Sequence, residues 1–501
     1  MTTVSFRPRD GCVLGTVADS TAVQVSTTVD LATSAAPGLA SARPSRRQAW
    51  LESVADALDA HRDELTRLAD LETALGRTRL TGELARTAAQ LRFYGRVAAE
   101  GGYLGAAIDH RTDATPRLVR INRPLGPVAV FGAGNFPFAF GMLGNDTASA
   151  LAAGCPVVAK AHPAHVVTCA RLAEIAEQAL REAGAPPGTF GMVVGFDAGV
   201  ELVGRPGVKA VGFTGSQAGG LAVWRLANER DEVIPVFAEM GTVNPVVMTP
   251  LAAASRAAEW ASGFVDSFTL GDGQFCTKPG LMLAPAGHRV PRTVADALHR
   301  AGHGATMLTR GIADAVAAGL DQLRAAGAEP VGIVPGTGSG WSADTAVLAA
   351  PIDALQPGSR LLEECFGPVA LVVEYDGRPE LDAALARLQG SLTGTVLTGG
   401  PQDPDTAHLV ATLAERVGRV TVDEWPTGVA WTWAQHHGGP WPATSAPSST
   451  SVGAGALGRF VRPVTFQSVP DQDLPAPARA AVAVANPWAI PRRIDGVLTI
   501  P

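Results

Sequence analysis

The residues most able to do chemistry begin with a single cysteine in a polar loop. Cys276 lies in Gln274-Phe-Cys-Thr-Lys-Pro279, which is flanked by glycine. A thiol in such a loop can be exposed and ionised, and a thiolate is a nucleophile for covalent catalysis. The alternative is a buried, inert cysteine, which is the usual fate of a free cysteine.

A carboxylate offers the complementary chemistry. Glu239 interrupts the apolar stretch from Ile234 to Met248, at the end of a strand-like run. A carboxyl group in apolar surroundings has a raised pKa and can act as a general base near neutral pH. The alternative is a partly solvated acid at a strand end.

The other cysteines indicate neither a disulfide framework nor a zinc site. The chain has five cysteines, an odd number, widely spaced and without a CxxC pair or a Cys/His cluster. We expect Cys155, Cys169 and Cys365 to be structural, and we expect no bound metal.

Two glycine-containing turns follow strand-like runs. Gly212-Phe-Thr-Gly-Ser-Gln-Ala-Gly219 separates an apolar run from a helical pattern, where small residues let backbone approach a pyrophosphate. The alternative is a strand-to-helix turn that needs glycine for steric reasons alone. Gly132-Ala-Gly-Asn135 is not the GxGxxG fingerprint of dinucleotide-binding folds, because Pro137 occupies the last glycine position.

The elements around these residues predict an α/β protein. Apolar runs alternate with helical segments between Pro127 and Glu239, which indicates a parallel, doubly wound sheet of nucleotide-binding type. An amphipathic helical region precedes it from Ser45, and a second α/β lobe follows it. Runs at Thr115–Asn122 and Arg462–Val469 predict strands outside the main core, and the segment after Pro470 is expected to extend over the surface.

Composition narrows the function classes. The 501 residues suffice for several domains, and 46% hydrophobic against 17% charged residues is typical of a folded chain. A net charge of −7 excludes the basic surface that nucleic acid or anionic lipid attracts. The charge-free run Pro124–Asn145 contains too many prolines and glycines for a membrane helix. The first ten residues lack a secretory pattern, so we expect a cytoplasmic protein.

Six ordered motifs together resemble the NAD(P)-dependent aldehyde dehydrogenase superfamily, over roughly residues 45 to 470. They are Phe131-Gly-Ala-Gly-Asn-Phe-Pro137, Val157-Val-Ala-Lys160, Gly212-Phe-Thr-Gly-Ser216, Ala238-Glu-Met-Gly-Thr-Val-Asn-Pro245, Gly273-Gln-Phe-Cys-Thr277 and Glu363-Glu-Cys-Phe-Gly-Pro-Val369.

The resemblance implies catalytic roles. Cys276 would attack the aldehyde carbonyl to give a thiohemiacetal, and hydride loss would leave a thioester. The side-chain amide of Asn135 and the backbone N–H of Cys276 would hold the oxyanion. Glu239 would activate the water that releases a carboxylic acid, and would help to deprotonate Cys276.

The resemblance also implies a site for NAD or NADP. Lys160 would hold the adenosine ribose, Gly215 and Ser216 would form the phosphate and nicotinamide turn, and Glu364 would grip the nicotinamide ribose. Two further residues complete this set: Phe366 would pack beside that ribose, and His162 with Lys160 would hold a 2′-phosphate if the cofactor is NADP.

Two segments, Asp146–His165 and Pro426–Ser445, are similar to the branch of dehydrogenases for 2-oxoglutarate semialdehyde, also called 2,5-dioxopentanoate. Relatives of that branch include broad-range and long-chain aldehyde dehydrogenases, which remain the alternative. Arg92 is a candidate contact for a substrate carboxylate, or else a solvated helix arginine. Trp433 and His437 are candidates for the mouth of the substrate tunnel, or else core residues.

The resemblance predicts a discontinuous Rossmann-type cofactor domain (1–108 and 125–240), a catalytic domain (241–448), oligomerisation strands (109–124 and 460–470) and a C-terminal tail (471–501). A homodimer or homotetramer is expected. Two rivals remain: a relative that transfers the acyl group to coenzyme A, which Glu239 disfavours, and a scaffold that retains the fold without catalysis. The six motifs argue against a third alternative, a cysteine hydrolase. A hydrolase would need a histidine paired with Cys276 and no nicotinamide site.

Overall fold

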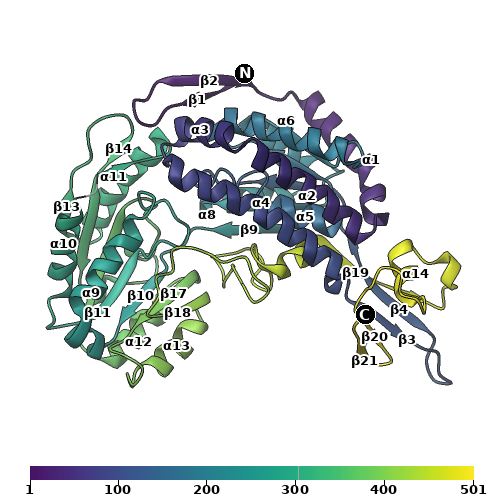
Figure 1. Ribbon diagram of the computed structural model, residues 1–501. Coiled ribbons are helices and arrows are strands. Elements are labelled where there is room, and N and C mark those ends of the chain that lie inside the picture. Colours follow the sequence, from purple (N-terminus) through teal and green to yellow (C-terminus); the bar gives the residue numbers. More distant parts are fainter. Residues whose placement is uncertain (303) are drawn as a thin grey trace.

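A computed structural model describes residues 1–302 and 304–501 as two sheet-centred domains and a projecting arm (Figure 1). The first domain holds five parallel strands in the order β7-β6-β5-β8-β9. Their bounds are β5 (Val128–Phe131), β6 (Val157–Lys160), β7 (Phe190–Val193), β8 (Ala210–Gly215) and β9 (Val236–Met240). These are the apolar runs of the sequence, and the predicted α/β class with a doubly wound parallel sheet is confirmed.

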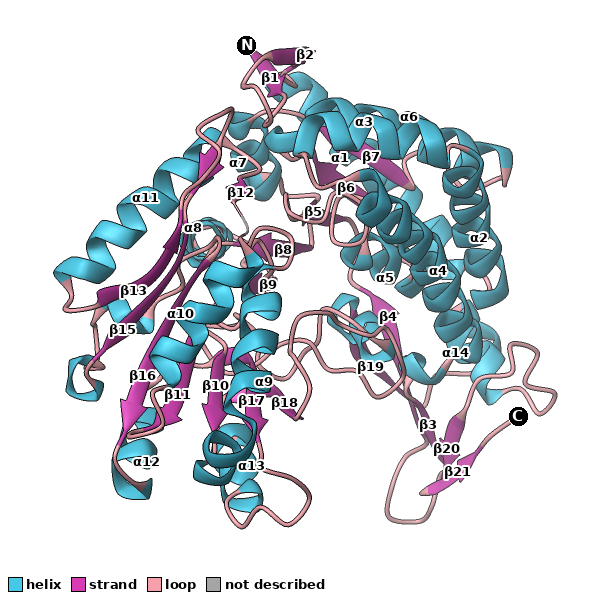
Figure 2. Ribbon diagram, turned by 60° about the vertical axis from the view of Figure 1, so that its left-hand side comes forward, coloured by secondary structure: helices cyan, strands magenta, loops and turns pink. Residues whose placement is uncertain are grey.

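Helices cover both faces of this sheet, which explains why its strands are apolar throughout. Figure 2 shows the long helices layered over it, and one buried cluster lies on each face. The helices are α1 (Ala22–Ser41), α2 (Pro44–Ala60), α3 (Arg62–Thr73), α4 (Arg77–Glu100), α5 (Asn145–Ala153), α6 (Val166–Glu182), α7 (Phe196–Gly204) and α8 (Gln217–Asn228).

The second domain is built on a seven-stranded sheet in the order β13-β15-β16-β11-β10-β17-β18, parallel except at the β13–β15 pair. The strands are β10 (Pro245–Met248), β11 (Leu281–Pro285), β13 (Glu329–Val334), β15 (Thr345–Ala350), β16 (Val369–Tyr375), β17 (Ser391–Leu397) and β18 (Val417–Val422). Its helices are α9 (Pro250–Thr269), α10 (Val290–Ala301), α11 (Arg310–Ala325), α12 (Arg378–Arg387) and α13 (Thr406–Ala414). Two short strands, β12 (Ala305–Thr306) and β14 (Ser342–Ala343), pair beside this sheet.

The arm is a five-stranded sheet in the order β19-β4-β3-β20-β21 that projects from the cofactor-type domain (Figure 1). It joins β3 (Ala106–Asp109) and β4 (Leu118–Pro124) to β19 (Val461–Gln467) and to β20 (Arg492–Ile494) and β21 (Val497–Thr499) from the C-terminal tail. The expectation of an extended tail is therefore wrong. The tail forms α14 (Ala476–Val482), whose alanines pack on β3 and β4, and then adds two strands to the sheet.

An N-terminal hairpin of β1 (Thr2–Phe6) and β2 (Val13–Ala18) was not expected from the sequence. Its buried Ser5 donates to the carboxylate of Glu72 on α3 at 2.5 Å, which ties the hairpin to the helical layer. Within the described part of the chain, no helix has both the length and the apolar composition of a membrane span.

Candidate active site

The edge strand β9 carries Glu239 to the boundary between the two domains. A late segment of the chain runs along this free edge: Met240 donates its backbone N–H to the carbonyl of Ala443 at 2.9 Å, and Ala238 donates to Ser445 Oγ at 2.9 Å. The backbone of Glu239 forms an isolated antiparallel β-bridge with that of Thr444. The loops on either side of this segment are thereby brought to the carboxylate.

The loop after α9 places Cys276 opposite Glu239. Asn244 Nδ2 donates to the carbonyls of Cys276 at 2.7 Å and of Lys278 at 3.0 Å, so the start of the second domain fixes the loop. Gly273 has a φ of +69°, and a Cβ there would overlap the backbone of Gly367. Only glycine therefore lets the two loops approach each other this closely.

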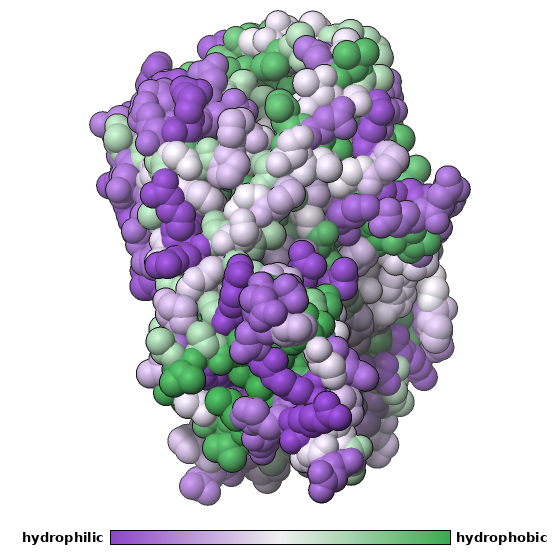
Figure 3. Space-filling model, turned by 90° about the vertical axis from the view of Figure 1, so that its right-hand side faces the viewer, coloured by the Kyte–Doolittle hydropathy of each residue, from purple (hydrophilic) through white to green (hydrophobic). Residues whose placement is uncertain are grey.

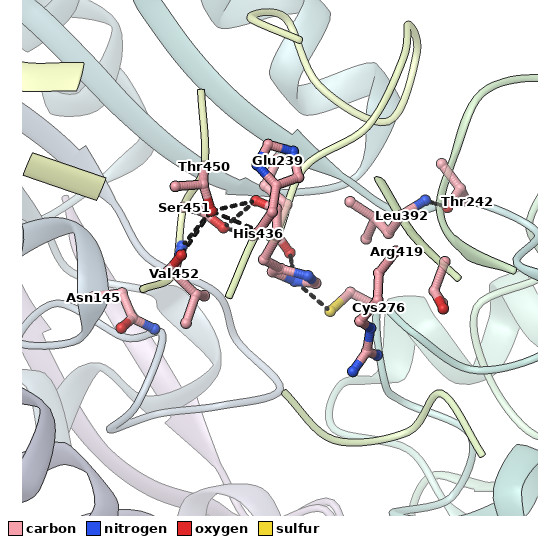
Figure 4. Close-up of polar contacts among 12 residues, drawn as sticks. Asn145, Glu239, Thr242, Cys276, Leu392, Arg419, His436, Thr450, Ser451 and Val452 are labelled. Carbon is pink, nitrogen blue, oxygen red and sulfur yellow. Dashed lines mark hydrogen bonds and ion pairs between the residues drawn. The ribbon is translucent and has the colours of Figure 1, made fainter. Parts of the chain in front are cut away.

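His437 completes a buried cluster of three side chains. Its Nε2 lies 2.8 Å from Glu239 Oε1 and 3.8 Å from Cys276 Sγ. Ser451 donates its hydroxyl to Glu239 Oε2, and Figure 4 shows these contacts converging between the domains. Glu239 and His437 are 3% and 1% exposed, so water screens the Glu239 charge little, while Cys276 is half-buried. His437 thus lies at the reacting groups and not at the tunnel mouth suggested by the sequence.

The charges in this cluster differ from the expectation for Glu239. Burial favours the neutral acid, but His437 and Ser451 outweigh it and lower the pKa of Glu239. Burial and the nearby negative charge of Glu239 raise the pKa of the Cys276 thiol well above its usual value. The expected raised pKa of Glu239 and the expected ionised form of Cys276 are therefore wrong, while the Cys276 side chain is half-buried. The site holds a neutral thiol beside an ionised carboxylate that can accept its proton.

Asn135 is adjacent to the cysteine loop, as an oxyanion donor would need to be. Its Nδ2 donates to the carbonyl of Gln274 at 2.7 Å, and its own carbonyl accepts from Arg79 Nη2 at 2.6 Å. The Arg79 guanidinium lies over the rings of Phe136 and Phe275 at 4.8 and 4.9 Å. Arg79, which the sequence analysis missed, fastens the Asn135 loop and the Cys276 loop to α4.

Glu364 has a buried carboxylate oxygen that can accept a hydrogen bond. Its Oε1 is buried and has no hydrogen-bond partner in the described chain, and a Cβ at Gly241 would overlap its carboxylate. Burial raises the pKa of Glu364 to about 7, and Lys278 opposes that shift. Phe366 follows in the same loop and is half-buried.

Lys160 ends β6 and is partly buried, which lowers its pKa.

His162 is placed differently from a phosphate ligand. Its Nδ1 accepts from the Ala164 N–H at 3.2 Å, its ring stacks on His165 at 5.2 Å, and burial lowers its pKa well below the usual value. A Cβ at Gly134 would overlap this ring. The space beside Gly134 is therefore filled by His162.

Ser216 caps α8, because its Oγ accepts the Gly219 N–H at 3.2 Å. Gly215 and Gly219 both face the ring of Phe213, which a Cβ at either position would crowd. This turn presents the start of a helix of twelve residues at the carboxyl end of β8, a geometry that favours an anion.

The remaining two candidates lie away from the cluster. Arg92 pairs with Asp56 at 2.6 Å and with Asp59 at 2.8 Å, so the guanidinium is directed to α2 and not toward Cys276. Those two carboxylates attract it more strongly than a distant pocket would. Trp433 is 60% exposed and packs edge-on against Phe93 at 6.3 Å.

Two more arginines near Cys276 were missed by the sequence analysis. Arg86 on α4 lies over the rings of Phe140 and Trp431, at 5.4 and 5.0 Å. Arg419 on β18 lies beside Cys276 in Figure 4 and lowers the pKa of its thiol. The helical period of α4 could have indicated Arg79 and Arg86 as site residues, since both lie on the face that also carries the buried Glu83.

Comparison with known proteins agrees with this geometry. The model of the aldehyde dehydrogenase family matches residues 2–440. The chain is 42% identical to "Alpha-ketoglutaric semialdehyde dehydrogenase 2" of Azospirillum brasilense, over 98% of this chain and 94% of that one. It is 38% identical to "Alpha-ketoglutaric semialdehyde dehydrogenase" of Acinetobacter baylyi, over 91% and 87%.

A solved structure shares the fold at low sequence identity. The 1-pyrroline-5-carboxylate dehydrogenase from Thermus with bound NAD superposes with a TM-score of 0.79 and 20% identity, covering 93% of this chain and 90% of that one. The family model matches most of the sequence, two relatives align over most of their length, and Cys276 lies beside Glu239. These observations lead to one assignment. The chain belongs to the aldehyde dehydrogenase family.

Proposed function

We propose that this protein oxidises 2-oxoglutarate semialdehyde to 2-oxoglutarate, with NAD or NADP as the oxidant. The observation that carries the chemistry is the buried cluster in which the Cys276 thiol faces an ionised Glu239. The substrate class comes from the two curated relatives, each of which spans most of this chain.

The residues of the cluster perform four tasks. Glu239 accepts the thiol proton, and the Cys276 sulfur then attacks the aldehyde carbon. The backbone N–H of Cys276 and the Asn135 amide stabilise the oxyanion of the thiohemiacetal, a kind of contact worth about 3–4 kcal/mol. The bound nicotinamide supplies the hydride acceptor. After releasing the first proton to solvent, Glu239 removes a proton from the water that cleaves the Cys276 thioester, returns it to the departing Cys276 thiolate, and the acid leaves.

The residues present fit a nicotinamide cofactor. The buried and unpartnered Glu364 Oε1 is an acceptor for a ribose hydroxyl, and the Ser216 turn at the start of α8 suits a phosphate. Lys160 offers an ammonium group to the adenosine ribose. His162 would take part in recognising a 2′-phosphate only if it were protonated, and its lowered pKa disfavours that.

Hydrolysis with Cys276 as the nucleophile is the second candidate, because His437 Nε2 lies 3.8 Å from Cys276 Sγ. Such a pair activates cysteine in hydrolases. The two functions differ in one readout, since only the dehydrogenase reduces a nicotinamide when it is given an aldehyde.

The test measures nicotinamide reduction with 2-oxoglutarate semialdehyde, succinic semialdehyde and pentanal, each with NAD and NADP. We expect the highest kcat/KM on the oxo acid and loss of turnover in Cys276→Ala. Equal turnover of pentanal would support the broad-range alternative. Absence of reduction on all three, with cleavage of a p-nitrophenyl ester, would support the hydrolase.

We also propose a homo-oligomer that assembles through the arm, and a reducing, cytoplasmic location that keeps Cys276 as a thiol. The oligomer would cover the exposed apolar side chains of the tail: Val484, Val497, Leu498 and Ile500. Figure 3 views the side on which the arm lies and shows hydrophobic side chains gathered in its lower half.

A further inference from the structure

Arg86 lies on the face of α4 that is turned to the catalytic loops. Phe138 and Ala139, on the loop after β5, donate their N–H groups to Glu83 one turn earlier, at 2.9 and 3.0 Å. This anchors the loop against the helix. The guanidinium of Arg86 is held at the same boundary by two rings, those of Phe140 and Trp431.

The Arg86 guanidinium is close to the reacting groups. The Phe140 ring that it covers lies 6.2 Å from the His437 ring, and His437 lies 3.8 Å from Cys276 Sγ. A single aromatic ring therefore separates Arg86 from the catalytic histidine. Burial lowers the pKa of Arg86, and the negative charge of Glu83 opposes that shift.

Arg86 differs from the two other arginines around Cys276 in its hydrogen bonds. Arg419 donates to the carbonyls of Pro426 at 2.5 Å and of Gly428 at 3.0 Å. Arg79 donates to the carbonyl of Asn135. Arg86 donates no hydrogen bond to any described residue, and its Nε and Nη2 are buried without a partner.

Two buried guanidinium nitrogens without a partner are costly, so a ligand that accepts from them is favoured. The rings of Phe140 and Trp431 lie against the guanidinium and carry no acceptor for its N–H groups, so its planar edge is left to make that contact. That edge matches a carboxylate, which accepts two parallel N–H bonds. Glu83 provides the nearest negative charge on α4; its Oε1 accepts the two backbone N–H groups, and its Oε2 makes no hydrogen bond to Arg86 or to any other described residue.

We propose that Arg86 binds the carboxylate of the oxo-acid substrate and selects aldehydes that end in a carboxylate over neutral ones. This rests on the proposed function, which supplies the aldehyde at Cys276. In 2-oxoglutarate semialdehyde a short carbon chain separates the aldehyde from the acid, so both ends can be held within one site. Arg92, which the sequence favoured for this task, points to α2 instead.

The experiment compares kcat/KM of wild type, Arg86→Gln and Arg86→Lys on 2-oxoglutarate semialdehyde and on pentanal. The exposed Arg96 on the same helix provides the matched control, Arg96→Gln. For Arg86→Gln we expect a fall of roughly 10- to 100-fold on the oxo acid, mostly in KM, and a change of less than about twofold on pentanal. Arg86→Lys keeps the charge but not the planar edge, so its loss is expected to be intermediate.

A second measurement does not depend on turnover. Titration calorimetry of 2-oxoglutarate into Cys276→Ala protein, with and without Arg86→Gln, reports the carboxylate contact directly, and we expect much weaker binding in the double variant. Equal losses on both aldehydes, or unchanged binding of 2-oxoglutarate, would overturn the role of Arg86. A wild-type enzyme without preference for the oxo acid would instead contradict the proposed function.

Discussion

At the scale of single residues, the cluster around Glu239 divides the work between charge and position. His437 and Ser451 hold the carboxylate in its ionised form against the effect of burial. The same negative charge, together with burial, keeps the Cys276 thiol neutral until a proton is transferred. The pair is therefore stable at rest and reactive only when the thiol proton moves to Glu239.

This arrangement predicts a shifted pH profile for His437→Gln. Removing the histidine removes a group that lowers the pKa of Glu239, so burial raises that pKa. Because the base must be ionised, the acid limb of the kcat profile should move to higher pH, with recovery of the rate on the alkaline side. Steady-state rates between pH 5 and 10 measure the shift.

His436→Gln is the control for this substitution, since His436 makes no hydrogen bond or ion pair with Glu239 within the described chain. Its profile should match that of wild type. Ser451→Ala should shift the limb in the same direction as His437→Gln. A profile for His437→Gln that falls uniformly at every pH would show that the histidine acts only through structure.

At the scale of elements, one buried lysine joins the nucleophile loop to the Glu364 loop. Lys278 is 1% exposed, and its Nζ donates to the carbonyls of Cys365 and Val369, each at 2.7 Å. The hydrogen bonds fix the spacing between Cys276 and Glu364, and hence between the thiol and a bound nicotinamide ribose. Burial lowers the pKa of Lys278.

Lys278→Met tests this link, because methionine keeps the length but leaves two buried carbonyls unpaired. We expect the free energy of unfolding to fall by about 2–4 kcal/mol and the KM for the cofactor to rise. Urea unfolding and initial rates measure the two effects. Lys209→Met, which breaks an exposed pair with Glu232, should cost less than about 1 kcal/mol. Equal losses in the two variants would argue against the link.

Elements also show why prediction from sequence succeeds in one part of the chain and fails in another. The strands of the cofactor-type sheet are covered on both faces, so each is a continuous apolar run that can be recognised locally. β3 is buried on one face only, and the strands of the tail gain their partners from the arm. Their sequences alone do not indicate a sheet.

The candidate site divides in the same way. Cys276, Glu239 and Glu364 lie in motifs with a family resemblance, and the structure places the first two in contact. The approach of His437 to Cys276 joins residues 161 positions apart and depends on Ala443–Ser445 closing the edge of β9. No local pattern contains that pairing. The choice between Arg86 and Arg92 likewise depends on which carboxylates face each side of α4.

At the scale of the whole molecule, the arm leaves apolar side chains exposed when the chain is present as a single copy. It projects from the body as one sheet, with α14 packed on one side (Figure 1). Its outer strand β21 exposes Val497 and Leu498, which are 69% and 55% exposed. Unpaired strand edges with apolar side chains tend to associate with another chain.

Light scattering should therefore give a mass that is a multiple of 51.5 kDa. Val497→Asp with Leu498→Asp places charge on the apolar edge, which should lower the mass toward that of one chain. Arg493→Asp lies on β20, which is paired on both sides, and should have a smaller effect. Circular dichroism checks that the variant remains folded. A monomeric wild type would contradict assembly through the arm. An oligomer that survives the double substitution would place the interface elsewhere, and the opposite edge of the arm at β19 would be the next strand to substitute, because it also carries exposed side chains.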